Sequence, residues 1–209
     1  ILQNHTLDPG TDKLVVVHPN RQLIRIYNFG NNETSDYINS FFTDMVIDFD
    51  KQYAYITDSG FPANNITPSI IVLNLKTEKI HRILQNNNLF MPDPALALIN
   101  NGTMLNENMI RAIGLNSIAL TCDGESIILS SLRSRNIFSV STKDIINAIN
   151  KKKNSNLDIT ENIAIKQGYK DKESDGIFIS SKNNLYMSNI EDINVKYSIE
   201  IDNELKRLD

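Results

Sequence analysis

The chain has 209 residues, of which 41% are apolar, so it can bury a packed core and wholesale disorder is excluded. The net charge of −4 provides no basic face for nucleic acid or an anionic membrane, and no apolar run approaches the roughly 18 residues of a membrane span. The single cysteine, Cys122, excludes an internal disulfide and a multi-cysteine zinc site.

Residues 11–29 form the first predicted element, a hairpin with strands at 14–17 and 23–27. Both strands are rich in Val, Ile and Leu, the residue types that favour β-structure. The hairpin is predicted to be the outer part of a larger sheet.

A four-stranded unit is predicted next, over residues 41–84. Its first strand begins at Asp44, and further strands follow at 53–57, 70–75 and 79–84. Residues 85–113 then carry three consecutive Asn and show neither strand nor helix periodicity. Long loops of this kind are uncommon without a role, so this loop is either a cover over one mouth of the molecule or a solvent-exposed insertion.

A second four-stranded unit is predicted over residues 114–168, with strands at 117–121, 126–131, 136–140 and 163–168. Asp123 and Gly124 form a strong hairpin turn between the first two strands. Ser141 followed by Asp144 predicts the start of a short helix that ends near residues 151–153. A last unit, over residues 174–200, begins at Asp175 and continues with strands at 185–188 and 195–199.

Three of these segments align without a gap over seventeen positions, namely residues 44–60 (DMVIDFDKQYAYITDSG), 116–132 (NSIALTCDGESIILSSL) and 175–191 (DGIFISSKNNLYMSNIE). Each begins with Asp or Asn, continues as an apolar strand, turns on polar residues and returns through a second strand. A four-stranded unit that recurs at intervals of about 40 to 70 residues is typical of β-propeller blades.

Equivalent positions of the repeat are expected to lie at equal heights around the propeller axis. Asp44, Asn116 and Asp175 would then form a polar ring at one mouth of the channel. Their oxygens suit a hard cation such as Ca²⁺, or the amine or hydroxyl group of a ligand. Alternatively, these residues only satisfy backbone groups at the strand starts. The predicted ligand-binding residues, which include two ends of second strands, are Asp44, Asp58, Asn116, Asp175 and Asn189, and no catalytic residue is identified.

The sequence resembles the yellow and major royal jelly protein family. The resemblance is carried by AYITDSG (54–60), IIVLNLKT (70–77), RIL (82–84), SIAL (117–120), SLRSR (131–135), SDG (174–176) and NLYMSNIE (184–191). It implies an all-β, six-bladed propeller of which residues 1–209, as a single domain, supply about four blades at 11–29, 41–84, 114–168 and 174–200. The remaining blades would come from sequence outside this chain.

The resemblance also implies a non-catalytic or weakly catalytic propeller that binds a small ligand in its channel and is secreted or periplasmic. The family includes binders of amines and lipids, and some members are linked to dopachrome conversion. A scaffold whose 85–113 loop docks a protein partner is a further alternative.

A second similarity is to propellers of the gluconolactonase or regucalcin type, which hydrolyse sugar lactones with a divalent metal. Asn116 and Asp175 match two of the metal-ligand motifs of that family, which implies a calcium or zinc ion as cofactor. Thr43 occupies the place of a third ligand, an Asn in that family, so the similarity does not provide a complete metal site. The alternative function is therefore a metal-dependent lactone hydrolase.

Overall fold

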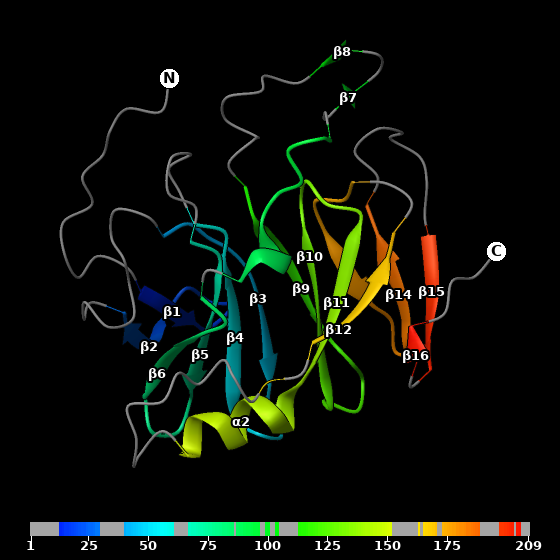
Figure 1. The fold of residues 1–209 in the computed structure, drawn as a ribbon. Coiled ribbons are helices and arrows are strands. Elements are labelled where there is room, and N and C mark those ends of the chain that lie inside the picture. The colour runs from blue at the N-terminus through cyan, green and yellow to red at the C-terminus, as the bar shows by residue number, and fades with distance from the viewer. Residues whose placement is uncertain are drawn as a thin grey trace.

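The computed structural model describes residues 13–29, 40–60, 67–85, 87–96, 99–100, 103–104, 113–151, 163, 165–170, 173–188, 197–202 and 204–205. These residues form three four-stranded and two two-stranded sheets, whose paired strands are antiparallel throughout. The sheets follow one another across the molecule, from β1 and β2 at one side to β15 and β16 at the other (Figure 1).

The first hairpin consists of β1 (Lys13–Val17) and β2 (Leu23–Asn28), as predicted. The second sheet follows it. Its strands, in spatial order, are β3 (Phe42–Asp48), β4 (Tyr53–Asp58), β5 (Ser69–Asn74) and β6 (Ile80–Ile83). Each strand pairs with the next in the chain, which is the meander expected of a propeller blade.

The third sheet has the same order, with β9 (Leu115–Leu120), β10 (Ser126–Ser131), β11 (Asn136–Ser141) and β12 (Ile165–Tyr169). Gly124 in the β9–β10 turn has a φ of 69°, the left-handed conformation that glycine adopts without steric cost. Helix α2 (Thr142–Lys151) lies between β11 and β12 in the chain. The Ser141 hydroxyl accepts a hydrogen bond from the Asp144 amide, so the predicted helix start is confirmed.

The fourth sheet contains β13 (Ile177–Ile179), β14 (Asn184–Met187), β15 (Tyr197–Asp202) and the short β16 (Glu204–Leu205). Residues 85–113 differ from the irregular loop that was expected. They contain the 3₁₀ helix η1 (Asn88–Phe90) and a small hairpin of β7 (Ile99–Asn100) and β8 (Thr103–Met104). Strands of two residues are too short to give a periodic pattern, which is why the sequence did not reveal them.

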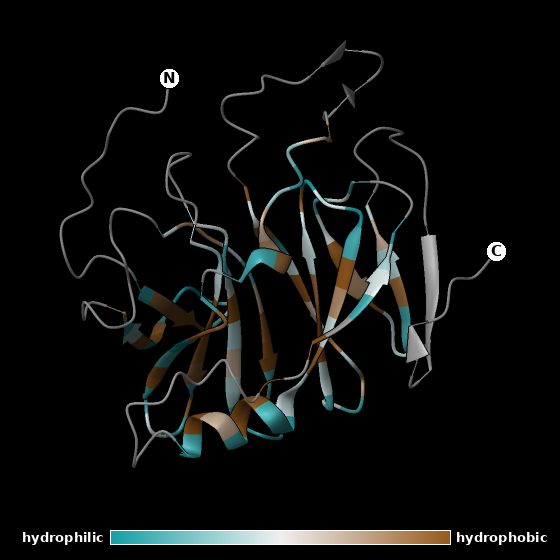
Figure 2. Ribbon diagram, in the orientation of Figure 1, coloured by the Kyte–Doolittle hydropathy of each residue, from teal (hydrophilic) through white to brown (hydrophobic). Residues whose placement is uncertain are grey.

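Both faces of the second and third sheets are buried. Successive side chains of a strand point to opposite faces, so each face packs against a different neighbouring sheet. On β4, Tyr53 and Tyr55 pack in the cluster shared with the third sheet, whereas Ala54 and Ile56 pack against the first hairpin. On β10, Ile128 instead joins the cluster shared with the fourth sheet. Hydrophobic residues accordingly run along the strands of the middle sheets (Figure 2).

The two end sheets expose large apolar side chains. On the first hairpin these are Val15, Val17, Leu23, Ile24 and Ile26, with exposed fractions from 40% to 59%, and on the fourth sheet Phe178 is 64% exposed. The innermost strands β3, β9 and β13 contact one another in sequence. Successive four-stranded meanders with adjacent inner strands confirm the prediction of an all-β, partial propeller.

Candidate functional site

The predicted polar residues at the inner strands lie next to one another. Asn116, near the start of β9, donates from Nδ2 to the Asp175 carboxylate (Oδ1, 2.7 Å) and to the Asp175 backbone oxygen (2.9 Å). The Ser117 hydroxyl also donates to the Asp175 backbone oxygen. Asn116 is buried, whereas Asp175 is exposed. The third and fourth sheets are thus joined at these two residues.

Asp44 connects the second and third sheets at the same end of the inner strands. Its Oδ2 accepts a hydrogen bond from the Ile118 amide of β9 at 3.1 Å, and its Oδ1 accepts one from the Met45 amide at 2.8 Å. Asn116 and Asp175 are therefore in direct contact, and Asp44 reaches the same strand β9 two residues beyond Asn116. Their predicted role in ligand binding remains a prediction. We call these three residues the inner-strand triplet.

Hydroxyl groups beside the triplet were missed from the sequence. Thr57 Oγ1 accepts a hydrogen bond from the Asp44 amide at 3.1 Å, and Ser188 Oγ accepts one from the Asp175 amide at 3.1 Å. Both hydroxyls stand thirteen positions after the Asp that they contact. A polar residue at this offset in two of the three repeats was the available signal. The third repeat carries the fully buried Leu129 there.

Thr43 belongs to the same set of hydroxyl side chains beside the triplet. Its Oγ1 donates to the Asn116 backbone oxygen at 2.8 Å and lies 3.0 Å from the Thr57 hydroxyl. Ser59 donates to the neighbouring Leu115 backbone oxygen at 2.6 Å. Side chains of the second sheet thereby satisfy backbone carbonyl groups of β9, which fixes the distance between the two inner strands.

Asp58 differs from the triplet because both of its carboxylate oxygens are used inside the protein. Oδ1 accepts hydrogen bonds from the amides of Phe41 (2.8 Å) and Gly60 (3.0 Å). Oδ2 forms an ion pair with Arg82 Nη1 at 2.6 Å, and the Asp58 side chain is 0% exposed. Asp58 therefore presents no exposed oxygen to a ligand. Asn189, the other predicted end-of-strand ligand, lies outside the described residues.

Ser130 occupies in the third sheet the repeat position that Asp58 occupies in the second. The cation that reaches it is Lys170, whose Nζ donates to Ser130 Oγ at 2.6 Å, to the Ser131 backbone oxygen at 3.0 Å and to Ser174 Oγ at 3.1 Å. Lys170 is only 4% exposed. Burial lowers the pKa of its ammonium group to about 7, and the negative charge of Glu173 opposes part of that shift.

A pocket of about 360 Å³ opens beside Asp44, between the first hairpin and the second sheet. Its walls are mainly apolar, and it is lined by Lys13, Leu14, Phe29, Phe42, Thr43, Asp44, Met45 and Ile56. The rings of Phe29 and Phe42 meet edge to face with their centroids 5.5 Å apart. One carboxylate and one ammonium group on an apolar lining suit a small amphipathic molecule.

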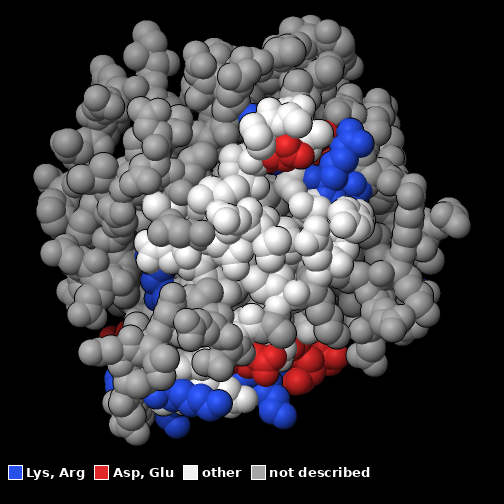
Figure 3. Space-filling model, viewed as in Figure 1, with Lys and Arg blue, Asp and Glu red and all other residues white. Residues whose placement is uncertain are grey.

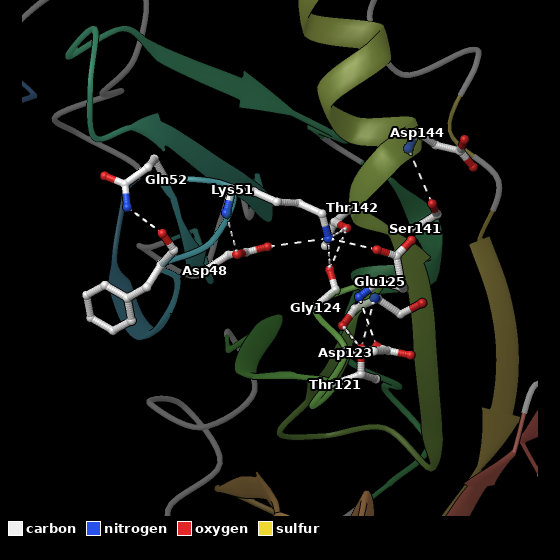
Figure 4. A network of polar contacts seen from close by, with 12 residues as sticks. Asp48, Lys51, Gln52, Thr121, Asp123, Gly124, Glu125, Ser141, Thr142 and Asp144 are labelled. Atoms are coloured by element: carbon white, nitrogen blue, oxygen red, sulfur yellow. Dashed lines mark hydrogen bonds and ion pairs between the residues drawn. The ribbon is translucent and has the colours of Figure 1, made fainter.

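A second polar network lies at the opposite end of β3 and β9, beside the start of α2 (Figure 4). Lys51 Nζ donates to the backbone oxygen of Gly124 at 2.5 Å and to Glu125 Oε1 at 3.0 Å, and lies 3.6 Å from Asp48 Oδ2. Thr142 donates to the same Gly124 oxygen at 2.7 Å. The network ties the second sheet, the third sheet and α2 together.

On the face shown in Figure 3, charged side chains gather along the lower edge, while the middle is uncharged.

Within the described part of the chain, no group of three or more His, Cys, Asp and Glu side chains is placed to hold a metal ion. A search of the described helices for one long and apolar enough to cross a membrane found none.

The sequence profile of the family described as Major royal jelly protein matches residues 5–203. No curated protein matches the chain at a significant level.

Solved structures of other proteins are similar to this chain at low sequence identity. Hydrazine synthase of Kuenenia stuttgartiensis is similar with a TM-score of 0.57 and 10% identity, over 87% of this chain and 49% of that one. A luciferin-regenerating enzyme is similar with a TM-score of 0.50 and 12% identity, over 89% of this chain and 56% of that one. A gluconolactonase of Xanthomonas campestris has a TM-score of 0.48 and 11% identity, over 84% of this chain and 48% of that one. The chain thus spans about half the length of these structures, and at such identities the likeness concerns the fold alone.

Proposed function

This chain belongs to the major royal jelly protein family, and on that basis we propose that its propeller binds a small ligand at the end of the inner strands where Asp44, Asn116 and Asp175 meet. The observation that carries the proposal is that the side chains of these three repeat-equivalent residues all bond to or from strand β9. Asn116 bonds directly to Asp175, and the Asp44 carboxylate bonds to the β9 backbone two residues beyond Asn116. Repeat-equivalent polar side chains that converge at one end of a propeller provide hydrogen-bonding groups for one molecule.

The chemistry of the site favours a ligand that donates hydrogen bonds and carries positive charge. Two carboxylates bond to β9, that of Asp44 to the Ile118 amide and that of Asp175 to the Asn116 side chain, and Asp175 is exposed. The pocket beside Asp44 adds apolar walls from Leu14, Phe29 and Phe42. An amine with a small apolar body can therefore place its ammonium group at a carboxylate and its body against these walls. The yellow and major royal jelly protein family includes binders of amines, which is consistent with this choice.

Calorimetric titration of the complete protein with phenethylamine tests the proposal. Phenylacetate is the matched probe, because it has a similar body and the opposite charge. We expect saturable binding of phenethylamine only, and about tenfold or more weaker binding in Asp44→Asn, because a charge-assisted hydrogen bond is lost. Asp50→Asn, at an exposed turn of the same sheet, is the matched control and should bind like the unchanged protein. Equal binding of both probes, or of neither, would contradict the proposal.

A metal-dependent lactone hydrolase is a second candidate, because Asn116 and Asp175, two of its predicted metal ligands, are in contact. The remaining residues fit a metal poorly. The Asn116 amide nitrogen faces Asp175, and the Thr43 hydroxyl, at the place of the third ligand, is bonded to the Asn116 backbone oxygen. Titration of the complete protein with Ca²⁺ and with Zn²⁺ separates the candidates. Stoichiometric metal binding that is lost in Asp175→Asn would favour the hydrolase, and no metal binding would remove it.

Further blades are proposed to pack on the two end sheets. The exposed aliphatic face of the first hairpin and the exposed Phe178 of β13 support this proposal, since equivalent faces of the middle sheets are buried against a neighbouring sheet. In a protein that contains those blades, the backbone amides of β1 and β13 should exchange hydrogen more slowly than they do in residues 1–209 alone.

A further inference from the structure

A basic side chain at or just beyond the outermost strand reaches the end of the second strand in both middle sheets. In the second sheet, Arg82 of β6 bonds to Asp58, Ser69 and Ser40. In the third sheet, Lys170, directly after β12, bonds to Ser130 and to the Ser131 backbone oxygen. Positions 58 and 130 are equivalent in the repeat.

The two cations differ in what else they hold. Arg82 bonds to Ser40, which precedes the first strand of its own sheet. Lys170 bonds at 3.1 Å to Ser174, which belongs to the connection that leads into the fourth sheet. Ser174 is 1% exposed and immediately precedes Asp175. Lys170 therefore bridges β10 of the third sheet to the residue that sets the start of the fourth.

The position of Asp175 depends on a small number of contacts. Its backbone oxygen accepts hydrogen bonds from Asn116 and Ser117, and its amide donates to Ser188. The first two contacts come from β9 and the third from its own sheet. On its N-terminal side, the Lys170–Ser174 bond anchors the chain to β10.

We propose that Lys170 is a positioning residue for the inner-strand triplet: its amino group holds Ser174 against β10 and thereby sets how Asp175 meets Asn116. The importance of this contact for binding rests on the proposed function, but the contact itself does not. The basis is geometric, because a buried amino group with two oxygen partners on β10 and a third on the connection to the fourth sheet constrains that connection.

The surroundings of Lys170 make the proposed link sensitive to pH. From β10 it meets only the neutral Ser130 hydroxyl and the Ser131 carbonyl, and from the connection it meets Ser174 and the charge of Glu173. Glu173 in turn lies 3.9 Å from Arg135 of the β10–β11 turn. An ammonium group donates three hydrogen bonds, whereas the neutral amine donates two. Because burial lowers the Lys170 pKa to about 7, the amino group donates one hydrogen bond fewer as the pH rises past neutrality, so a serine hydroxyl must donate to it in return or the contact is lost.

The side-chain amide resonances of Asn116 report directly on its bond to Asp175, so nitrogen-proton NMR of the full chain tests the proposal. We expect these resonances to titrate between about pH 6 and pH 8 in the unchanged protein. In Lys170→Met they should stay near the high-pH positions, and in Lys170→Arg, which keeps a permanent charge and its donors, near the low-pH positions. A titration that persists in a folded Lys170→Met variant, or Asn116 resonances that ignore both substitutions, would overturn the proposal.

Phenethylamine binding to the same proteins distinguishes this inference from the proposed function. We expect about threefold to tenfold weaker binding in Lys170→Met, since the hydrogen bond to Ser174 that orients Asp175 is lost together with the two bonds to β10. Lys170→Arg should restore the affinity. If Asn116 follows Lys170 while phenethylamine does not bind at all, the positioning role stands and the proposed function fails. If phenethylamine binds normally while Asn116 ignores Lys170, the reverse holds.

Discussion

In the second sheet the cation at the end of the second strand is Arg82, paired with a fully buried carboxylate, whereas in the third sheet it is Lys170, surrounded by hydroxyl and carbonyl groups. Both middle sheets thus place a hydrogen-bond-donating cation at the end of the second strand, but they neutralise its charge differently. In the second sheet, the Asp58 carboxylate neutralises the charge of Arg82 in a buried ion pair. The less compensated ammonium of the third sheet shifts its pKa instead, which makes that sheet the one that responds to pH.

The largest expected effect comes from breaking the compensated pair. Asp58→Asn removes the carboxylate that bonds to the buried Arg82, and loss of one partner from a buried pair costs about 3–5 kcal/mol. Denaturant unfolding of the variant should show this loss as a lower midpoint with an unchanged slope. Asp50→Asn, an exposed position on the same sheet, should leave the midpoint unchanged. A similar small change in both variants would remove the distinction between the two sheets.

The next effect concerns the pH dependence of the third sheet. The pKa of Lys170 is about 7 in the folded protein and 10.5 in the reference state. The unfolded chain therefore binds more protons between these values, so the folding free energy becomes more favourable as the pH rises through this window. Between pH 7 and pH 9 the gain is about 2 kcal/mol. The difference in unfolding free energy between the unchanged protein and Lys170→Met, measured at both pH values, should show this gain, and an equal difference at both would contradict it.

A third substitution gives the third sheet the carboxylate that the second sheet has at the end of its second strand. Ser130→Asp places a carboxylate where Asp58 stands in the repeat and should raise the Lys170 pKa by about 1–3 units. The rise in stability between pH 7 and pH 9 should then shrink by about 1–2 kcal/mol. Ser126→Asp, at the other end of the same strand β10, is the matched control and should leave the pH dependence intact. If both variants behave alike, the effect of Ser130→Asp is not local.

The smallest effect is expected where the second and third sheets meet through hydroxyl groups. Thr57→Val removes the group that contacts the Asp44 amide and lies 3.0 Å from the Asn116 backbone oxygen. We expect a loss of about 1 kcal/mol in unfolding free energy, because the Asp44 amide loses its hydroxyl partner while the Asn116 backbone oxygen keeps the hydrogen bond from Thr43. Thr77→Val, at an exposed turn, should cost less than half as much. An equal cost would show that the hydroxyl contributes nothing specific.

The strands and the contact between Asn116 and Asp175 could be predicted from the sequence for one reason. The repeat of seventeen positions fixes which residues begin the inner strands, and rotation about an axis brings such residues together. The contact between Asn116 and Asp175, 59 residues apart in the chain, follows from that geometry alone.

Contacts that the repeat does not contain could not be predicted. Asp58 aligned with the ends of the other second strands, but its partner Arg82 lies 24 residues away on the outer strand of the same sheet, outside the aligned segment. Lys170 likewise falls before the third repeat begins at Asp175. A pattern of strand positions carries no information on which side chain of an outer strand bends back to an inner one, because side-chain packing in three dimensions decides it.

Helix α2 has a consequence for how the molecule comes apart. It is inserted between two strands of the third sheet, yet Ile145, Ala148 and Ile149 pack in the cluster that both middle sheets share, and Thr142 joins the Lys51 network from the second sheet. Opening either middle sheet would therefore strip the helix from the other, so the two should unfold as one cooperative unit. Among the described residues, no helix links an end sheet to its neighbour in this way, so the amide hydrogens of the end sheets should exchange first.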